Sequence, residues 1–98
     1  MNEIDFKDWL QKQNTTKKVQ GDLISRIKRL ERAFDNIDLD EEYQKDKCCF
    51  LLSLFKNKGI NSEMNKFETV ELPIGKYQLS TYKYALKKYI SFIESKAL

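Results

Sequence analysis

The sequence predicts an all-α fold with four helices, and three observations support the all-α prediction. Apolar residues recur at intervals of three and four over long stretches, as on the inner side of a packed helix. The chain has one Pro and three Gly, too few for a turn-rich β fold. Its 98 residues are enough for one domain with a single hydrophobic core. We expect helices at about 4–13, 16–36, 40–57 and 79–96.

The first two predicted helices are separated by a short polar break. In the helix at 4–13, Phe6, Trp9 and Leu10 share one side and should dock it onto the core. A threonine in the break can cap the next helix by accepting a free backbone N–H. The narrow apolar side of that second helix, at 16–36, consists of Val19, Leu23, Ile27, Leu30, Phe34 and Ile37. The short connection predicts that the two helices pack as neighbours.

The third predicted helix, at 40–57, follows an acidic run, and carboxylates are favoured near a helix amino terminus. Asp40 is the expected cap. The helix should be mostly buried, because it has a broad apolar side. That side consists of Tyr43, Phe50, Leu51, Leu54 and Phe55. Gly59 can adopt the left-handed conformation that ends helices.

The connection at 60–76 has no helical period, and Pro73 and Gly75 mark it as a loop with at most one irregular turn. The last helix should start near Ser80 as its cap. Its inner side is expected to consist of Tyr82, Leu86, Tyr89, Ile90 and Ile93. Among the tyrosines, only Tyr84 is expected to be free to contact a partner. Because this helix runs to the end of the chain, we expect the 98 residues to be a piece of a longer protein.

Charge is unevenly distributed along the chain. Residues 16–37 carry six bases and three acids, residues 76–98 carry five bases and one acid, and residues 38–46 carry five acids and one base. Helical projection places the bases of both basic helices opposite their apolar sides, which suits an approaching polyanion. Lys and Arg also coat ordinary solvated helices, so the second helix by itself slightly favours a scaffold over an anion-binding surface.

The residue types exclude several kinds of chemistry. The chain has no His, and Cys48 and Cys49 are its only cysteines, so we expect no metal site, no cofactor and no Cys/His pair. The scattered glycines form no phosphate loop, and we expect no enzymatic activity in this segment. Helical projection places Cys48 on the apolar side and Cys49 toward solvent. Adjacent thiols, no signal peptide and no apolar run of ~20 residues predict a cytoplasmic protein without a membrane span.

These elements resemble a known family. The resemblance rests on a short helix with Phe6, Trp9 and Leu10, a Thr-Thr break, a helix of the form V-x-x-x-L-x-x-x-I-x-x-L-x-x-x-F, and a closing S-T-Y-K-x-A-L-K-K-Y-I-x-F-I. Together they are similar to the amino-terminal core-binding domain of phage integrases and other tyrosine recombinases, and this resemblance implies a SAM-like orthogonal bundle of four helices. A similar helical domain is attached to restriction-endonuclease-like proteins, and the sequence does not separate the two.

The resemblance implies binding of double-stranded DNA in DNA integration or recombination, with catalysis left to a separate carboxyl-terminal domain. The implied surface is the outer sides of the second and fourth helices. The matching positions are Lys18, Ser25, Lys28, Arg29 and Arg32 on the second helix, and Thr81, Tyr84, Lys87 and Lys88 on the fourth. The acidic loop at 60–75 and the acidic start of the third helix depart from the family pattern and would have to face away from DNA.

The alternative is a helical protein-interaction or dimerisation module that has no nucleic-acid role. An exposed apolar patch would favour this alternative, and Trp9, Phe67 and Ile74 are the candidates for it.

Overall fold

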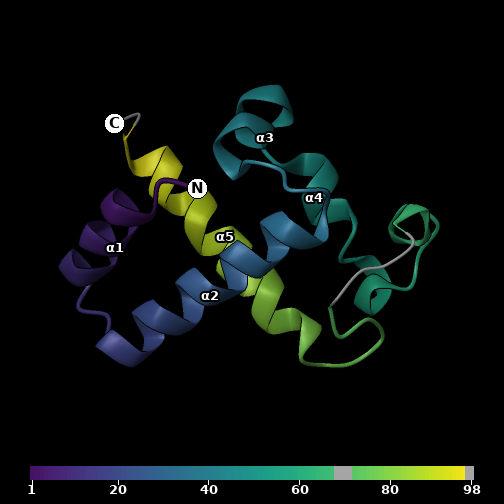
Figure 1. Cartoon of the computed structure of the whole chain (residues 1–98), viewed down its shortest axis with the longest axis horizontal. Coiled ribbons are helices and arrows are strands. Elements are labelled where there is room, and N and C mark those ends of the chain that lie inside the picture. Colours follow the sequence, from purple (N-terminus) through teal and green to yellow (C-terminus); the bar gives the residue numbers. More distant parts are fainter. Residues whose placement is uncertain (68–71, 97–98) are drawn as a thin grey trace.

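A computed structural model describes residues 1–67 and 72–96, and every element in these two ranges is helical (Figure 1). The elements are α1 (Glu3–Lys12), α2 (Lys17–Ala33), α3 (Leu39–Asp46), α4 (Cys49–Ser53), the 3-10 helices η1 (Lys56–Gly59) and η2 (Met64–Lys66), and α5 (Leu79–Lys96). The all-α prediction is therefore confirmed for the described residues.

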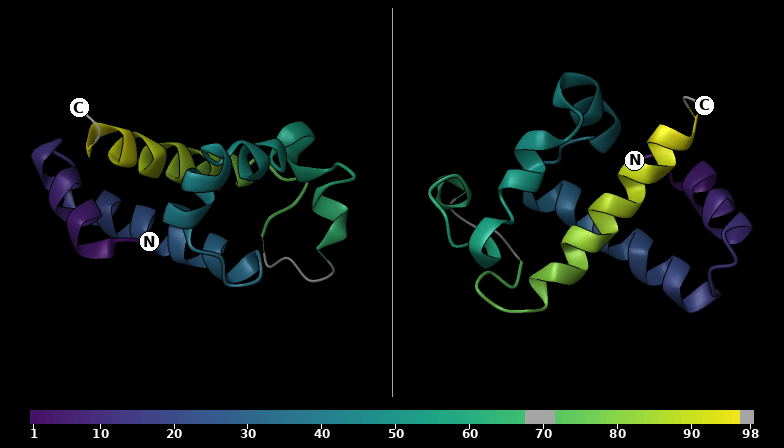
Figure 2. Two further views of the ribbon diagram at one scale, coloured as in Figure 1. Left: turned by 90° about the horizontal axis from the view of Figure 1, so that it is seen from above. Right: turned by 180° about the vertical axis from the view of Figure 1, so that it is seen from behind.

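The fold is built on α2 and α5, which cross as an X (Figure 1) and lie in separate layers when the molecule is seen from above (Figure 2). The short helix α1 packs against both of them. The helices α3 and α4 lie at one side of the crossing, and the long connection follows beyond them (Figure 1). The core consequently sits between the two layers.

Apolar side chains of α1, α2 and α5 fill the space around the crossing. Phe6 and Leu10 of α1, Ile27 of α2 and Tyr89 of α5 are fully buried. The rings of Phe6 and Tyr89 meet edge to face, with their centroids 4.9 Å apart. Because each large apolar side chain contributes about 1.5–3 kcal/mol when it is buried, these contacts fix α1 onto the crossing pair.

The structure confirms α1 and α2 with shifted ends. The hydroxyl of Thr16 accepts a hydrogen bond from the backbone N–H of Val19 at 3.3 Å, so a threonine does cap α2. The helix ends at Ala33, three residues before the predicted end, because Asp35 and Asn36 adopt positive φ angles of 63° and 56°. Val19 was expected on the inner side but is 40% exposed.

The continuous helix predicted at 40–57 is wrong. Lys47 and Cys48 have left-handed φ angles of 58° and 62°, and they divide this stretch into α3 and α4. The turn lets Cys48 and the apolar residues after it enter the core while the polar α3 stays at the surface. The cap is Asp38, whose carboxylate accepts the N–H of Asp40 at 3.2 Å, and not Asp40 itself.

The third region is also less buried than predicted. Within α3 only Leu39 is buried, Tyr43 is partly buried, and Phe50 of α4 is 40% exposed. Leu51, Leu54 and Phe55 are buried, as expected. The apolar side predicted for one straight helix is therefore divided among α3, α4 and the turn after α4, which contains Leu54 and Phe55.

In its described part, the connection between residues 60 and 76 contains the irregular turn η2, and Gly59 has the expected positive φ of 84°. An alternation of apolar and polar residues at 67–72, too weak to predict a strand, falls partly outside the described residues. Ser80 lies inside α5, and its hydroxyl donates to the carbonyl of Tyr77 at 2.7 Å, so it does not act as the predicted cap. Tyr77 is 75% exposed, so the expectation that only Tyr84 is free was wrong.

The inner side of α5 is wider than the predicted one. Leu86 and Tyr89 are buried, while Tyr82, Ile90 and Ile93 are only partly buried. Ala85 and Phe92, which were not predicted there, are buried as well. The buried side of α5 is therefore rotated relative to the predicted one.

A polar network ties the start of the chain to three other elements. The amino group of Met1 donates to Glu31 and to Asp38, each at 2.8 Å. The N–H of Asn2 donates to the hydroxyl of Tyr89 at 2.7 Å, and that hydroxyl donates to Asp40 at 2.9 Å. The network joins the amino terminus to the end of α2, the start of α3 and the middle of α5.

Charge and burial in this network shift the pKa of two of its groups. Burial lowers the pKa of the terminal amine, but hydrogen bonds to Asp38 and Glu31 outweigh it and leave the pKa above 8.0. The hydrogen bond from the amine holds the pKa of Asp38 below 3.8, although burial opposes this shift. The ionised forms of both groups are therefore favoured by the folded state.

Candidate nucleic-acid interface

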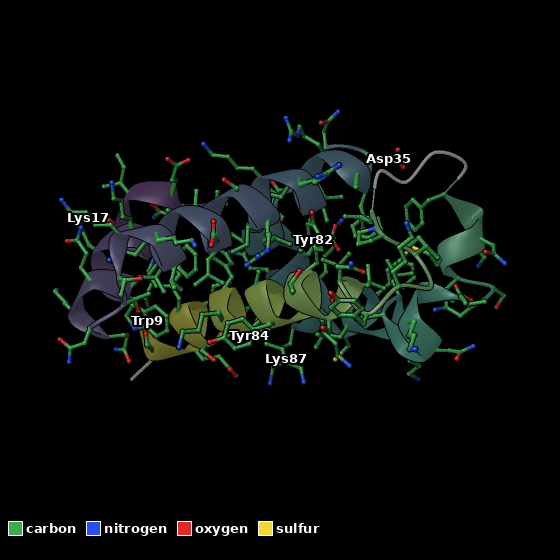
Figure 3. All side chains as sticks on the ribbon, turned by 90° about the horizontal axis from the view of Figure 1, so that it is seen from below. Trp9, Lys17, Asp35, Tyr82, Tyr84 and Lys87 are labelled. Atoms are coloured by element: carbon green, nitrogen blue, oxygen red, sulfur yellow. The ribbon has the colours of Figure 1, made fainter. Side chains whose placement is uncertain are left out.

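The residues expected to bind DNA lie on α2 and α5, and the crossing of these helices separates them. Each helix turns its apolar side toward the other layer, so their outer sides face in different directions (Figure 2). Figure 3 shows Tyr82 on the side of α5 that faces α2, and Lys87 on the side that faces away. The structure therefore does not bring the two predicted sets together into one surface.

The α2 set is exposed, but part of it is occupied by contacts within the protein. Lys18, Ser25, Lys28, Arg29 and Arg32 are all exposed. The ammonium of Lys28 forms an ion pair with Glu3 at 2.7 Å, across to the start of α1. Arg29 turns toward α5, where its guanidinium donates to the hydroxyl of Tyr82 at 3.4 Å.

Arg32 lies beside Glu31 at the end of α2, in a surface hollow that also includes Lys28. The ion pair with Glu3 competes with a phosphate for the charge of Lys28. The outer side of α2 is therefore a weaker anion-binding surface than its sequence indicated.

A groove lies between α2 and the first turns of α5. It is lined by Arg26, Arg29, Leu72, Pro73, Gln78, Thr81 and Tyr82 and has a volume of about 480 Å³. Thr81, predicted to face outward, lines this groove, and its hydroxyl donates to the carbonyl of Gln78 at 2.7 Å. Arg29 of α2 and Thr81 of α5 are thus predicted site residues from different helices that line one groove.

The remaining predicted residues follow the outer side of α5. Tyr84 is 56% exposed, and Lys87 is exposed one turn further on. The ammonium of Lys88 lies over the ring of Trp9, 5.6 Å from its centroid. A cation over an indole keeps its charge available to solvent while its stem is held in place. These three side chains form the more open part of the predicted site.

Lys83 was missed by the sequence prediction, although it lies one turn before Lys87 on α5. We call the surface formed by Lys83, Tyr84, Lys87 and Lys88 the α5 basic face. The sequence contains a signal for it, because no Asp or Glu occurs between Lys76 and Ile93. Within the described part of the chain, neither Lys83 nor Lys87 forms an ion pair.

The cysteines show no reactive pair. Cys48 is buried and Cys49 is exposed, as the helical projection predicted, and both are free thiols. Burial, with smaller contributions from nearby acids, raises the pKa of Cys48 to about 12, so its thiol stays protonated. In the described ranges, no group of three or more His, Cys, Asp or Glu side chains is placed to hold a metal ion.

Among the helices described, none combines the length and the apolar character that crossing a membrane requires. Comparison of the chain with protein-family models, with curated proteins and with solved structures gives no match in any of the three. The resemblance to recombinase core-binding domains therefore rests on the sequence pattern alone.

Proposed function

We propose that the chain is a DNA-binding module of the core-binding type found in tyrosine recombinases, and that it contacts double-stranded DNA through the α5 basic face. Under this proposal the helices correspond to a SAM-like bundle in which the predicted third helix is divided into α3 and α4. A restriction-type parent protein fits the same proposal. Any catalytic step would belong to a domain outside these residues.

One observation carries the choice of surface. Lys83 and Lys87 are separated by one helical turn, Tyr84 lies between them, and no described carboxylate pairs with either lysine. Unpaired cations at this spacing attract the phosphates of a nucleic-acid backbone. An exposed tyrosine between them can donate a hydrogen bond to a phosphate or sugar oxygen.

The proposed contact is mainly with the DNA backbone. Because the opposite side of α5 is buried against α2, the helix offers only one side to a ligand. Phosphate contacts position a protein on DNA but carry no direct sequence information. We therefore propose sequence-tolerant or weakly specific binding.

The test compares two double variants that remove the same charge. Lys83→Gln with Lys87→Gln changes the α5 basic face, and Lys18→Gln with Arg32→Gln changes the rival surface on α2. Fluorescence anisotropy of a labelled duplex should show about hundredfold or greater weakening for the first pair, since each of its two charge-assisted contacts is worth about 1.5–3 kcal/mol. The second pair should lower the affinity for DNA only by the amount expected from removing two positive charges from the protein.

Equal weakening by the two pairs would contradict the choice of α5, and greater weakening by the α2 pair would reverse it. Circular dichroism of both variants provides the control for folding. All four side chains lie on the surface, and none is fully buried, so the substitutions should leave the core intact.

The alternative of a protein-interaction module was expected to be supported by an exposed apolar patch, and the three candidate residues do not form one. Trp9, Phe67 and Ile74, the candidates for an exposed apolar patch, are partly buried and pack against the core. Large apolar side chains that are exposed, such as Ile4 and Ile60, lie on different elements. Sedimentation of the chain alone still separates the two functions, because the DNA-binding proposal does not require a tight dimer.

A further inference from the structure

A second cluster of lysines surrounds a small pocket at the start of α5. Lys58, Lys76 and Lys83 line it together with Phe55 and Tyr77, and its volume is about 270 Å³. Phe55 is 5% exposed and forms the pocket wall, whereas Tyr77 is 75% exposed and stands at the rim. Three cations and two aromatic rings thus share one pocket.

Two turns that are far apart in the sequence build this pocket. The N–H of Gly75 donates to the carbonyl of Lys58 at 2.7 Å, which joins the end of η1 to the segment before α5. Gly59 has a φ of 84°, and a Cβ added there would lie 2.9 Å from Cδ2 of Leu79. Only a glycine at this position lets the η1 turn pack so closely against α5.

The backbone at Lys58 is in an unfavourable conformation. Its φ is 57°, in the left-handed region, although lysine has no special preference for that region. The conformation places the Lys58 side chain in the pocket beside Lys76 and Lys83. Unfavourable backbone conformations of this kind often occur where a ligand is held.

The described residues that line the pocket include three bases and no acid. Within the same part of the chain, none of these three lysines forms an ion pair. Like charges that share a pocket repel one another, and a bound anion would reduce this repulsion. The pocket is therefore suited to a ligand that carries more than one negative charge.

Backbone donors at the start of α5 do not complete the site. The N–H of Leu79 already donates to the carbonyl of Lys76 at 3.1 Å, and the N–H of Ser80 donates to Tyr77 at 3.1 Å. A ligand would therefore be held by side chains, by the ammonium groups on its anionic part and by the ring of Tyr77 on a planar part.

We propose that this lysine pocket binds a phosphomonoester attached to a nucleobase, as in a nucleoside monophosphate. A phosphomonoester carries about −1.5 to −2 charges at neutral pH, which matches three lysines better than a phosphodiester with a single charge. The exposed ring of Tyr77 offers the base a stacking surface. The source is a free nucleotide or the phosphorylated end of a strand that lies on the α5 basic face, because Lys83 belongs to both sites.

The test titrates the 98-residue chain with adenosine 5′-monophosphate and with adenosine, followed by nuclear magnetic resonance. The monophosphate should shift the ring signals of Tyr77. Adenosine should bind at least about tenfold more weakly than the monophosphate, because it lacks the charge-assisted contacts. Lys58→Gln with Lys76→Gln should weaken monophosphate binding by about tenfold or more. The matched control, Lys7→Gln with Lys12→Gln on α1, should leave it unchanged.

Equal binding of the two ligands, wild-type affinity in the Lys58/Lys76 variant, or no binding at millimolar monophosphate would each overturn the proposal. If the double variant unfolds, Lys76→Gln alone is used. These results do not depend on whether α5 binds DNA, since neither ligand is a polymer and Lys87 is not changed.

Two duplexes, with and without a 5′-phosphate, then identify the source of the phosphomonoester. Tighter binding of the phosphorylated duplex, lost in the Lys58/Lys76 variant, supports a strand end and rests on the DNA-binding proposal. Equal binding of both duplexes, with monophosphate binding retained, supports a free nucleotide.

Discussion

Adding a few residues before Met1 should destabilise the fold, because the terminal amine belongs to the polar network at the edge of the core. The amine donates to Glu31 and Asp38, each at 2.8 Å, and lies 3.8 Å from Asp40. An extension converts this ammonium group into a neutral amide with a single N–H. At least one hydrogen bond and all of the charge attraction would be lost.

The exposure of the two partners sets the magnitude of the loss. The Glu31 side chain is 16% exposed and the Asp38 side chain is 44% exposed. The contact with the sheltered Glu31 should be worth about 1.5–3 kcal/mol, and the contact with the more exposed Asp38 about 0.2–1 kcal/mol. Since the amide retains one donor, we expect a loss of about 2 kcal/mol, which lowers the melting temperature by roughly 8–16 °C in a chain of this length.

The pKa shifts add a dependence on pH. The raised pKa of the amine means that its stabilisation is fully present below pH 8.0 and is lost as the pH rises through the folded-state pKa. The lowered pKa of Asp38 means that its stabilisation is present above pH 3.8 and is lost as the pH falls through the folded-state pKa. The alkaline loss should be absent from the extended chain.

Thermal denaturation followed by circular dichroism measures both effects. The same extension placed after Leu98 is the control, and Asp8→Asn on the exposed side of α1 is the control for Asp38→Asn. Asparagine can still cap α3, so Asp38→Asn mainly removes the charge. The effects of the extension and of Asp38→Asn should be less than additive. An extended chain with an unchanged melting temperature would refute the stabilising role of the amine.

Three further predictions concern stability and thiol reactivity. Gly21→Ala should raise the free energy of unfolding, measured by urea denaturation, by about 0.5–1 kcal/mol, because a Cβ there meets no atom within 4 Å and the position is inside α2; a lower free energy of unfolding would contradict this. Tyr89→Phe should lower the free energy of unfolding by about 1–2 kcal/mol, because it removes hydrogen bonds at 2.7 Å and 2.9 Å; an unchanged denaturation curve would show that water replaces them. A thiol reagent should modify Cys49 rapidly and Cys48 only after unfolding, and rapid modification of both would show that the thiol of Cys48 is accessible.

Helical periodicity predicted the elements in which one side of a helix decides the packing. Phe6 and Leu10 of α1 and Leu23 and Ile27 of α2 were expected to be buried, and they are. Thr16 was identifiable because helix starts need a side-chain acceptor for their free N–H groups. These features depend on residues that are close in sequence.

The division of the third helix could not be predicted in this way. Lysine and cysteine give no signal for a left-handed conformation, yet Lys47 and Cys48 both adopt it. The conformation serves the burial of Cys48 and Leu51, which depends on the position of the other helices. At these two residues, tertiary packing therefore determines the backbone conformation, although the local sequence does not favour it.

The candidate site was predicted only in part for a related reason. A helical projection finds the outer side of one helix but says nothing about how two helices are turned relative to each other. The outer sides of α2 and α5 therefore seemed to form one surface until their crossing was known. The contact between Gly59 and Leu79 brings Lys58 to the lysine pocket, and the sequence near Lys58 gives no signal for that contact.

The salt dependence of DNA binding tests the central claim most directly. If Lys83, Lys87 and Lys88 each neutralise one phosphate, the logarithm of the association constant should fall with the logarithm of salt concentration with a slope of about −2 to −3. In the Lys83→Gln/Lys87→Gln variant the slope should become shallower by about 2. A wild-type slope that the substitutions leave unchanged, or an absence of binding at low salt, would contradict DNA binding through the α5 basic face.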